Sequence, residues 1–114
     1  MAVTYTTPQL VRRRIEEIDA SLLDEDIEQY IYEAEGIIDA VMKDSFKTDF
    51  DATKHAIIRS CATNIAAYHC ISYNPSVHPS LTDAELIANM LWNAADEAKT
   101  ILSNPRTVAY LKSL

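Results

Sequence analysis

The segment DEDIEQYIYEAEGIIDAV, residues 24–41, shows the architecture of this chain most clearly. Its apolar side chains recur at alternating intervals of four and three residues, at Ile27, Ile31, Ala34, Ile38 and Val41. These intervals match an α-helix that buries one face. Asp24 is suited to cap the first turn, and Glu25 and Asp26 favour the positive end of the helix dipole. The segment therefore predicts a long amphipathic helix.

Acidic side chains cover the other side of this predicted helix. Glu28, Glu35 and Asp39 share one face, opposite the apolar residues. A catalytic pair of carboxylates needs partial burial, and a calcium loop needs a different spacing of acids. We interpret the three residues as a solvated acidic surface. A metal site and an electrostatic role towards a polyanion are the alternatives.

Gly36 is the only glycine of the chain and lies in the interior of this helix. A glycine there costs about 1 kcal/mol relative to alanine. We expect another backbone to approach Gly36 closely, since a missing side chain permits such an approach. With only one glycine, the chain has no glycine-rich phosphate-binding loop.

Helix signals also flank this segment on both sides. Thr7 and Pro8 are a cap and a first-turn residue, and they predict a short helix that ends near Ile18. Residues 51–72 are small or apolar nearly all round, which is typical of a buried central helix.

The C-terminal third contains two more helix starts. Thr82 and Glu85 match a capping box at the head of an apolar stripe. Asn104 and Pro105 match the cap and first position of a short helix in the tail. The sequence therefore predicts a single all-α domain over residues 1–114, a compact bundle of four main helices plus a short C-terminal helix or tail.

Charge is distributed unevenly along the chain, whose net charge is −7. Residues 1–14 carry +3, residues 15–52 carry −11, and residues 53–114 carry +1. An acidic body disfavours tight nucleic-acid binding, which depends on neutralising phosphates. We expect no signal peptide and no membrane span, because no apolar run is long enough, and we expect a reducing cytosol for the two cysteines.

The residues that most often carry catalysis or metals are scattered. His55, Cys61, His69 and Cys70 all fall on the predicted central helix, at separations that place them around its circumference. Zinc ligands usually come in pairs at short fixed spacing. We therefore expect no enzyme activity, no catalytic or metal site and no cofactor, and we interpret Cys61 as a small core residue.

Five side chains are candidates for an interface between subunits. Arg12, Arg13 and Arg14 form the one basic cluster. They either contact a phosphate or an acidic partner, or they pair with nearby acids that include Glu16 and Glu17. The other two candidates are Tyr32 and Trp92, which lie off the apolar stripes of their helices, and exposed aromatic residues are enriched at interfaces.

Several short motifs together resemble a known family. They are Tyr5-Thr6-Thr7-Pro8-x-x-Val11, Ser21-Leu22-Leu23-Asp24-Glu25-Asp26-Ile27-Glu28-x-Tyr30-Ile31, Ala34-Glu35-x-x-Ile38-Asp39 and Ala62-Thr63-x-x-Ala66-Ala67-Tyr68. Their order and spacing resemble the head–tail connector proteins of tailed bacteriophages and prophages, also called head-completion or adaptor proteins. The resemblance covers residues 3–72 well and the fourth predicted helix loosely, and none of its motifs contains a catalytic residue.

The resemblance implies a structural virion protein made in the bacterial host cytoplasm and located at the head–tail junction. Such a subunit forms a ring, here expected to be dodecameric, beneath the portal protein. The ring extends the DNA channel without specific DNA binding, and it docks the tail or a second head-completion protein. Segment 43–50, KDSFKTDF, departs from the family, whose members often carry a more basic, aromatic segment there.

The resemblance also suggests roles for individual residues. The C-terminal segment would reach the portal, with Arg106, Val108, Tyr110 and Leu111 as the contact candidates. The channel wall would repel phosphate through Glu28, Glu35 and Asp39. The alternative function is a small cytosolic acidic helical binding module, a regulator or DNA mimic without enzyme activity.

Overall fold

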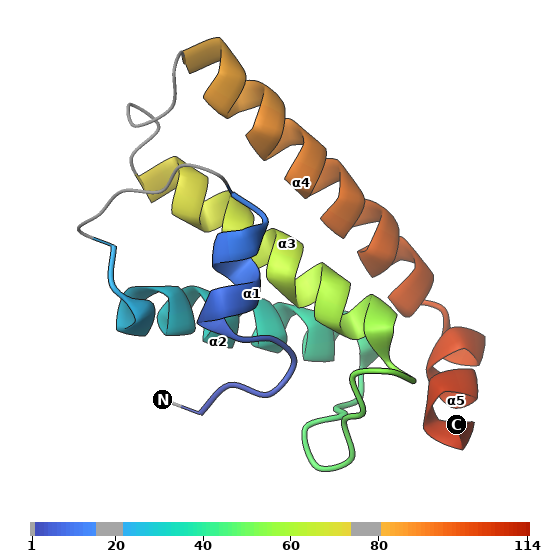
Figure 1. The fold of residues 1–114 in the computed structure, drawn as a ribbon. Helices are drawn as coiled ribbons and strands as arrows, with labels where there is room; N and C mark the ends of the chain where they lie inside the picture. The colour runs from blue at the N-terminus through green and yellow to red at the C-terminus, as the bar shows by residue number, and fades with distance from the viewer. Residues whose placement is uncertain (1, 16–21, 74–80) are drawn as a thin grey trace.

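The computed structural model describes residues 2–15, 22–73 and 81–114. All regular secondary structure in these ranges is helical, which confirms the predicted all-α class (Figure 1). The helices are α1 (Pro8–Arg13), α2 (Asp24–Met42), α3 (Ala56–Tyr73), α4 (Leu81–Leu102) and α5 (Pro105–Ser113).

The central helix of the bundle is α3, as the sequence predicts. It lies between α2 and α4, and α1 crosses over it on one side (Figure 1). Every residue from Cys61 to Ala67 is buried, because neighbours cover this helix nearly all round. Cys61 itself is fully buried and its thiol donates to the Ala95 carbonyl at 3.7 Å, which confirms its interpretation as a core residue.

The two ends of α3 contribute to two apolar clusters. The cluster at its C-terminal end joins α1, α2 and α4 through residues that include Val11, Ile31 and Ala84. The cluster at its N-terminal end is closed by the N-terminal segment, by loop 43–55 and by α5. Tyr5 and Phe46 are both fully buried in this second cluster.

The first two helices differ from the prediction at their ends. Helix α1 ends at Arg13, with Arg14 as its C-cap, so the predicted end near Ile18 is wrong. Helix α2 has Leu23 and not Asp24 as its N-cap. The Asp26 carboxylate accepts the Leu23 backbone N–H at 2.9 Å, which moves the cap one residue towards the N-terminus.

Helix α3 begins at Ala56, five residues later than predicted. The Asp51 carboxylate accepts the backbone N–H groups of Thr53 and Lys54, and the His55 N–H donates to the Asp51 carbonyl. These bonds make a separate turn ahead of the helix. Asp51 has a pKa below its usual value, because those two N–H groups stabilise its carboxylate.

Helix α5 forms as predicted from its cap. The Asn104 side chain accepts the Arg106 N–H at 2.9 Å and Pro105 occupies the first turn. Helix α4 begins at Leu81, and the proposed capping role of Thr82 falls on a side chain outside the described residues.

The surroundings of Gly36 also differ from the prediction. A Cβ built on Gly36 would meet nothing within 4 Å, and the residue is exposed. The expected close approach of another backbone within the chain is therefore wrong. Gly36 leaves a small exposed gap on the outer face of α2.

Candidate functional site

The N-terminal segment is fixed to α2 by a buried carboxylate. Glu35 is fully buried, and its Oε2 accepts the backbone N–H groups of Thr4 and Tyr5, each at 2.7 Å. Its other oxygen, Oε1, is buried without a hydrogen-bond partner. The interpretation of Glu35 as a solvated, channel-facing acid is therefore wrong, since its carboxylate is buried and accepts two backbone N–H groups of the N-terminal segment.

Asp39 holds the same segment one turn further along α2. The fully buried side chain of Tyr5 donates its hydroxyl hydrogen to Asp39 at 2.5 Å, and the hydroxyl oxygen accepts the Phe46 N–H at 2.9 Å. Burial, followed by the bond to Asp39, raises the pKa of Tyr5 from 10.0 to about 12. Asp39 also forms an ion pair with Lys47 at 3.6 Å, and its side chain is only 22% exposed. Its carboxylate is therefore bound by Tyr5 and Lys47 within the chain.

Two residues of α3 complete this attachment. The Arg59 guanidinium donates from Nε to the Tyr5 carbonyl at 3.0 Å, and the hydroxyl groups of Thr6 and Thr63 lie 2.7 Å apart. We refer to the contacts of residues 4–6 with Glu35, Asp39, Arg59 and Thr63 as the N-terminal clamp. Of the three predicted channel-facing acids, only Glu28 lies outside it, and Glu28 is half-buried.

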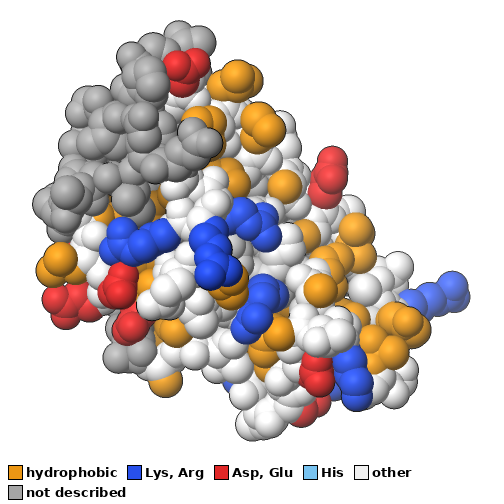
Figure 2. All heavy atoms as spheres, viewed as in Figure 1, with side chains coloured by type: hydrophobic (Ala, Val, Ile, Leu, Met, Phe, Trp, Pro, Cys, Tyr) orange, Lys and Arg blue, Asp and Glu red, His pale blue; other side chains and the backbone are white. Residues whose placement is uncertain are grey.

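Basic side chains gather over α1 and the neighbouring part of α3 on the face shown in Figure 2. Arg12 pairs with Asp24 at 2.9 Å, which matches the predicted pairing with a nearby acid. Arg14 donates to the Asn64 side chain at 2.6 Å. Arg13 is exposed and makes no ion pair with a described residue, and the proposed partners Glu16 and Glu17 lie outside the described residues.

We name this surface the arginine face and define it as Arg12, Arg13 and Arg14 of α1 together with Arg59 of α3. Asp24 is the acid that pairs within it among the described residues. The sequence placed three of these arginines together, whereas Arg59 joins them only because α1 packs against α3. Counted over the four arginines and Asp24, the arginine face carries a net positive charge.

Four aromatic rings from three helices form a continuous row. The rings of Tyr30 and His69 stack with centroids 5.6 Å apart, His69 meets Tyr68 at 5.4 Å, and Tyr68 meets Trp92 at 5.0 Å. We name this row, Tyr30–His69–Tyr68–Trp92, the aromatic band. All four side chains are partly exposed, and Trp92 is 38% exposed. Sequence reasoning found only Trp92, because the other three come from helices whose mutual orientation was unknown.

Acidic groups flank the aromatic band. Lys99 lies over Trp92, with Nζ 4.5 Å from the ring centroid, and pairs with Asp96 at 3.1 Å. At the other end, burial raises the pKa of the Tyr30 phenol, and the nearby charges of Asp26 and Glu33 add to this shift.

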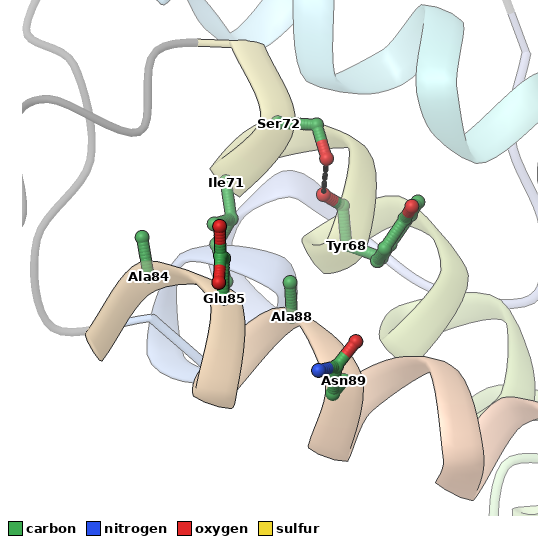
Figure 3. A pocket seen from close by; sticks show the side chains of 7 residues that line it. All are labelled: Tyr68, Ile71, Ser72, Ala84, Glu85, Ala88 and Asn89. Atoms are coloured by element: carbon green, nitrogen blue, oxygen red, sulfur yellow. Dashed lines mark hydrogen bonds between the residues drawn. The ribbon is translucent and has the colours of Figure 1, made fainter. Parts of the chain in front are cut away.

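A pocket of about 360 Å³ opens beside Tyr68, between the C-terminal half of α3 and the N-terminal half of α4 (Figure 3). Its apolar lining comes from Ile71, Ala84 and Ala88. Its polar lining comes from Tyr68, Ser72, Glu85 and Asn89. The pocket therefore offers one exposed acid next to the aromatic band.

The remaining interface candidate, Tyr32, lies apart from these surfaces. It is 48% exposed, and Lys47 Nζ lies 5.7 Å from its ring centroid. Tyr32 thus belongs to the surface of α2 beside the N-terminal clamp and not to the aromatic band.

The predicted portal-contact residues divide into two pairs. Arg106 and Tyr110 are exposed, and Tyr110 is 63% exposed. Val108 and Leu111 are buried in the core, so their assignment to a partner surface is wrong. The His55 Nδ1 accepts the Asp51 N–H, which leaves the hydrogen on Nε2 to donate to the Leu111 carbonyl at 3.0 Å and fix α5 in place.

The two cysteines belong to the core of the bundle. Both are free and buried, and burial raises the pKa of Cys61 to about 11 and of Cys70 to about 12. Within the described ranges, no three His, Cys, Asp or Glu side chains group closely enough to hold a metal ion, and no helix there is long and apolar enough to cross a membrane.

Comparisons with protein-family models, curated proteins and solved structures found no match to the chain.

Proposed function

We propose that this chain is a structural protein without enzyme activity, a head–tail connector of a tailed bacteriophage or prophage. In this role it assembles as a dodecameric ring beneath the portal protein. The ring extends the DNA channel and docks the tail or a second head-completion protein. The resemblance in residues 3–72 provides the proposal, and the N-terminal clamp is the observation that supports it.

The N-terminal clamp supports the proposal because residues from three of the four motifs contact one another in it. Tyr5 and Thr6 belong to the first motif, Glu35 and Asp39 to the third, and Thr63 to the fourth. They lie 30 to 57 residues apart in the chain and contact one another in the structure. Motifs of a non-catalytic subunit are expected to specify its packing in this way.

The acidic surface that a DNA channel would need is smaller than the sequence predicts. Glu35 is buried, and Asp39 is held by Tyr5 and Lys47. Of the three predicted channel-facing acids, Glu28 alone lies outside the N-terminal clamp, and it is partly exposed. We assign Glu28 the role of repelling phosphate from a channel wall.

The exposed residues of α5 are the portal-contact candidates that remain. Removing residues 104–114 would uncover the core, because Val108 and Leu111 are buried there. Point variants at the surface are therefore the better test. We expect Arg106→Glu and Tyr110→Ala to weaken retention of the chain on immobilised portal protein, while the control Lys54→Glu is retained like the wild type.

A pull-down with the portal protein from the same phage or prophage decides between the two functions. Retention of the wild-type chain supports the connector. An acidic DNA mimic would instead not be retained on the portal protein, and it would compete with DNA for binding to a basic partner. The burial of Glu35 disfavours that alternative, since it removes one acid from the surface that would imitate DNA.

A further inference from the structure

The arginine face and the aromatic band occupy different sectors of α3. Arg59 and Tyr68 are nine residues apart on this helix, which at 100° per residue separates them by about 180°. Asn64, which binds Arg14, is about 140° from His69 but only about 40° from Tyr68. The two surfaces are therefore separate regions that meet the same helix, and a second copy can reach one without covering the other.

The described residues of the two surfaces carry opposite net charge. Among those residues, the arginine face has four guanidinium groups and one paired acid, Asp24. The aromatic band is flanked by four carboxylates and one ammonium group, that of Lys99. The carboxylates are those of Asp26, Glu33, Glu85 and Asp96. Two arginine faces would repel each other, as would two aromatic bands, whereas one of each attracts.

The side-chain chemistry of the two surfaces is also matched. A guanidinium group stacks on aromatic rings and binds carboxylates in the same plane. Tyrosine, tryptophan and arginine are the residues that most often dominate the energy of protein interfaces. The pocket beside Tyr68 gives a long cationic side chain a place to enter next to Glu85 (Figure 3).

We propose that the occupant of the aromatic band is the arginine face of a second copy of this chain. Contacts of this kind join unlike surfaces, so each copy keeps one free surface of each kind and a third copy can add. Such head-to-tail contacts generate a ring when the rotation between copies closes. The inference deepens the proposed function by naming the two surfaces that meet, and it rests on that function only for closure into a ring.

Two variants with one damaged surface each provide the test. Arg13→Glu damages the arginine face at an exposed residue that makes no ion pair with a described residue. Trp92→Ala damages the aromatic band. Because Trp92 packs on Tyr68, Glu85→Lys serves as a second variant of that surface, at an exposed position beside the pocket. Arg106→Glu and Tyr110→Ala are matched controls on α5, outside both surfaces.

Sedimentation velocity over a concentration series at low salt is the measurement. We expect the wild type and both controls to associate reversibly, and each damaged variant to associate at least about tenfold more weakly. A mixture of Arg13→Glu with Trp92→Ala, or with Glu85→Lys, still contains one intact surface of each kind. It should form a 1:1 dimer and no larger species.

Three results would overturn the inference. They are a wild type that stays monomeric at high concentration, damaged variants that associate like the wild type, and a mixture that stays monomeric although the wild type associates. Self-association that depends on Arg13 but not on Trp92 or Glu85 would also contradict it, and would mean that the arginine face binds a different surface of the second copy. None of these results bears on portal retention, which tests the proposed function separately.

Discussion

The hydroxyl group of Tyr5 donates a 2.5 Å hydrogen bond to Asp39, 34 residues further along the chain. The same hydroxyl accepts the backbone N–H of Phe46. One phenol therefore joins the N-terminal segment, α2 and the loop that follows α2. This arrangement makes the stability of the bundle depend on a side chain that lies outside every helix.

Tyr5→Phe is expected to lower the free energy of unfolding by about 1–3 kcal/mol. The substitution keeps the ring but leaves a buried N–H of Phe46 without its acceptor. Urea denaturation of the variant and of the wild type measures the difference. Tyr110→Phe is the matched control, because Tyr110 is 63% exposed, and it should unfold like the wild type. Equal stability of Tyr5→Phe and the wild type would contradict the central role of this phenol.

The contribution of Tyr5 should disappear at high pH. Its pKa is raised to about 12 from 10.0, so the folded state holds the proton more tightly than the unfolded state. The stabilisation is complete below about pH 10 and is lost as the pH rises towards 12. The buried thiols of Cys61 and Cys70 also weaken the fold at alkaline pH, but they do so in both proteins.

The measurement is the difference in unfolding free energy between the wild type and Tyr5→Phe at a series of pH values. This difference should shrink between pH 10 and pH 12, while it stays constant from pH 7 to pH 9. A difference that does not change with pH would mean that the phenol is not held in its neutral form by the fold.

Glu35→Ala is expected to release the N-terminal segment. The carboxylate accepts two backbone N–H groups, and a buried N–H without an acceptor costs about 1–3 kcal/mol. Glu35→Gln keeps one carbonyl oxygen at the same place, so its effect should be smaller. Hydrogen exchange at the amides of Thr4 and Tyr5 reports the change directly.

The expected order of amide exchange rates is Glu35→Ala fastest, then Glu35→Gln, then the wild type. Glu28→Ala is the control, since Glu28 lies outside the N-terminal clamp. Unaltered exchange at Thr4 and Tyr5 in Glu35→Ala would show that other contacts hold the segment.

Gly36→Ala should stabilise the protein by up to about 1 kcal/mol, because alanine has the higher helix propensity. The new methyl group would meet nothing within 4 Å. The reverse change at another exposed position of α2, Ala40→Gly, should destabilise by a similar amount. Thermal unfolding followed by circular dichroism compares the two. A lower melting temperature for Gly36→Ala would reveal a contact that the isolated chain lacks.

The sequence predicted the elements that depend on local patterns. The apolar spacing in residues 24–41 and the cap formed by Asn104 each act within a few residues, and both helices are present. The nearly uniform apolar character of residues 51–72 likewise identified α3 as the central helix. The predicted helix ends were less accurate where a side chain changed which residue is the cap. The Asp26 carboxylate does this at α2, because it binds the Leu23 N–H and makes Leu23 the N-cap.

The surfaces could not be predicted, because they combine residues from different helices. Periodicity alone placed Glu35 on a solvated face, since nothing local indicates that the backbone of Thr4 and Tyr5 returns to cover it. The aromatic band needs the relative positions of α2, α3 and α4, and a single sequence does not contain them. Val108 and Leu111 looked like a free apolar tail until the core that covers them was known.

Native mass spectrometry of the chain mixed with the portal protein is the most direct test of the proposed connector. The account predicts a complex in which copies of this chain equal the portal subunits in number, with a closed ring of the chain on the portal. A chain that remains monomeric and leaves the portal unoccupied at all mixing ratios would contradict the connector function.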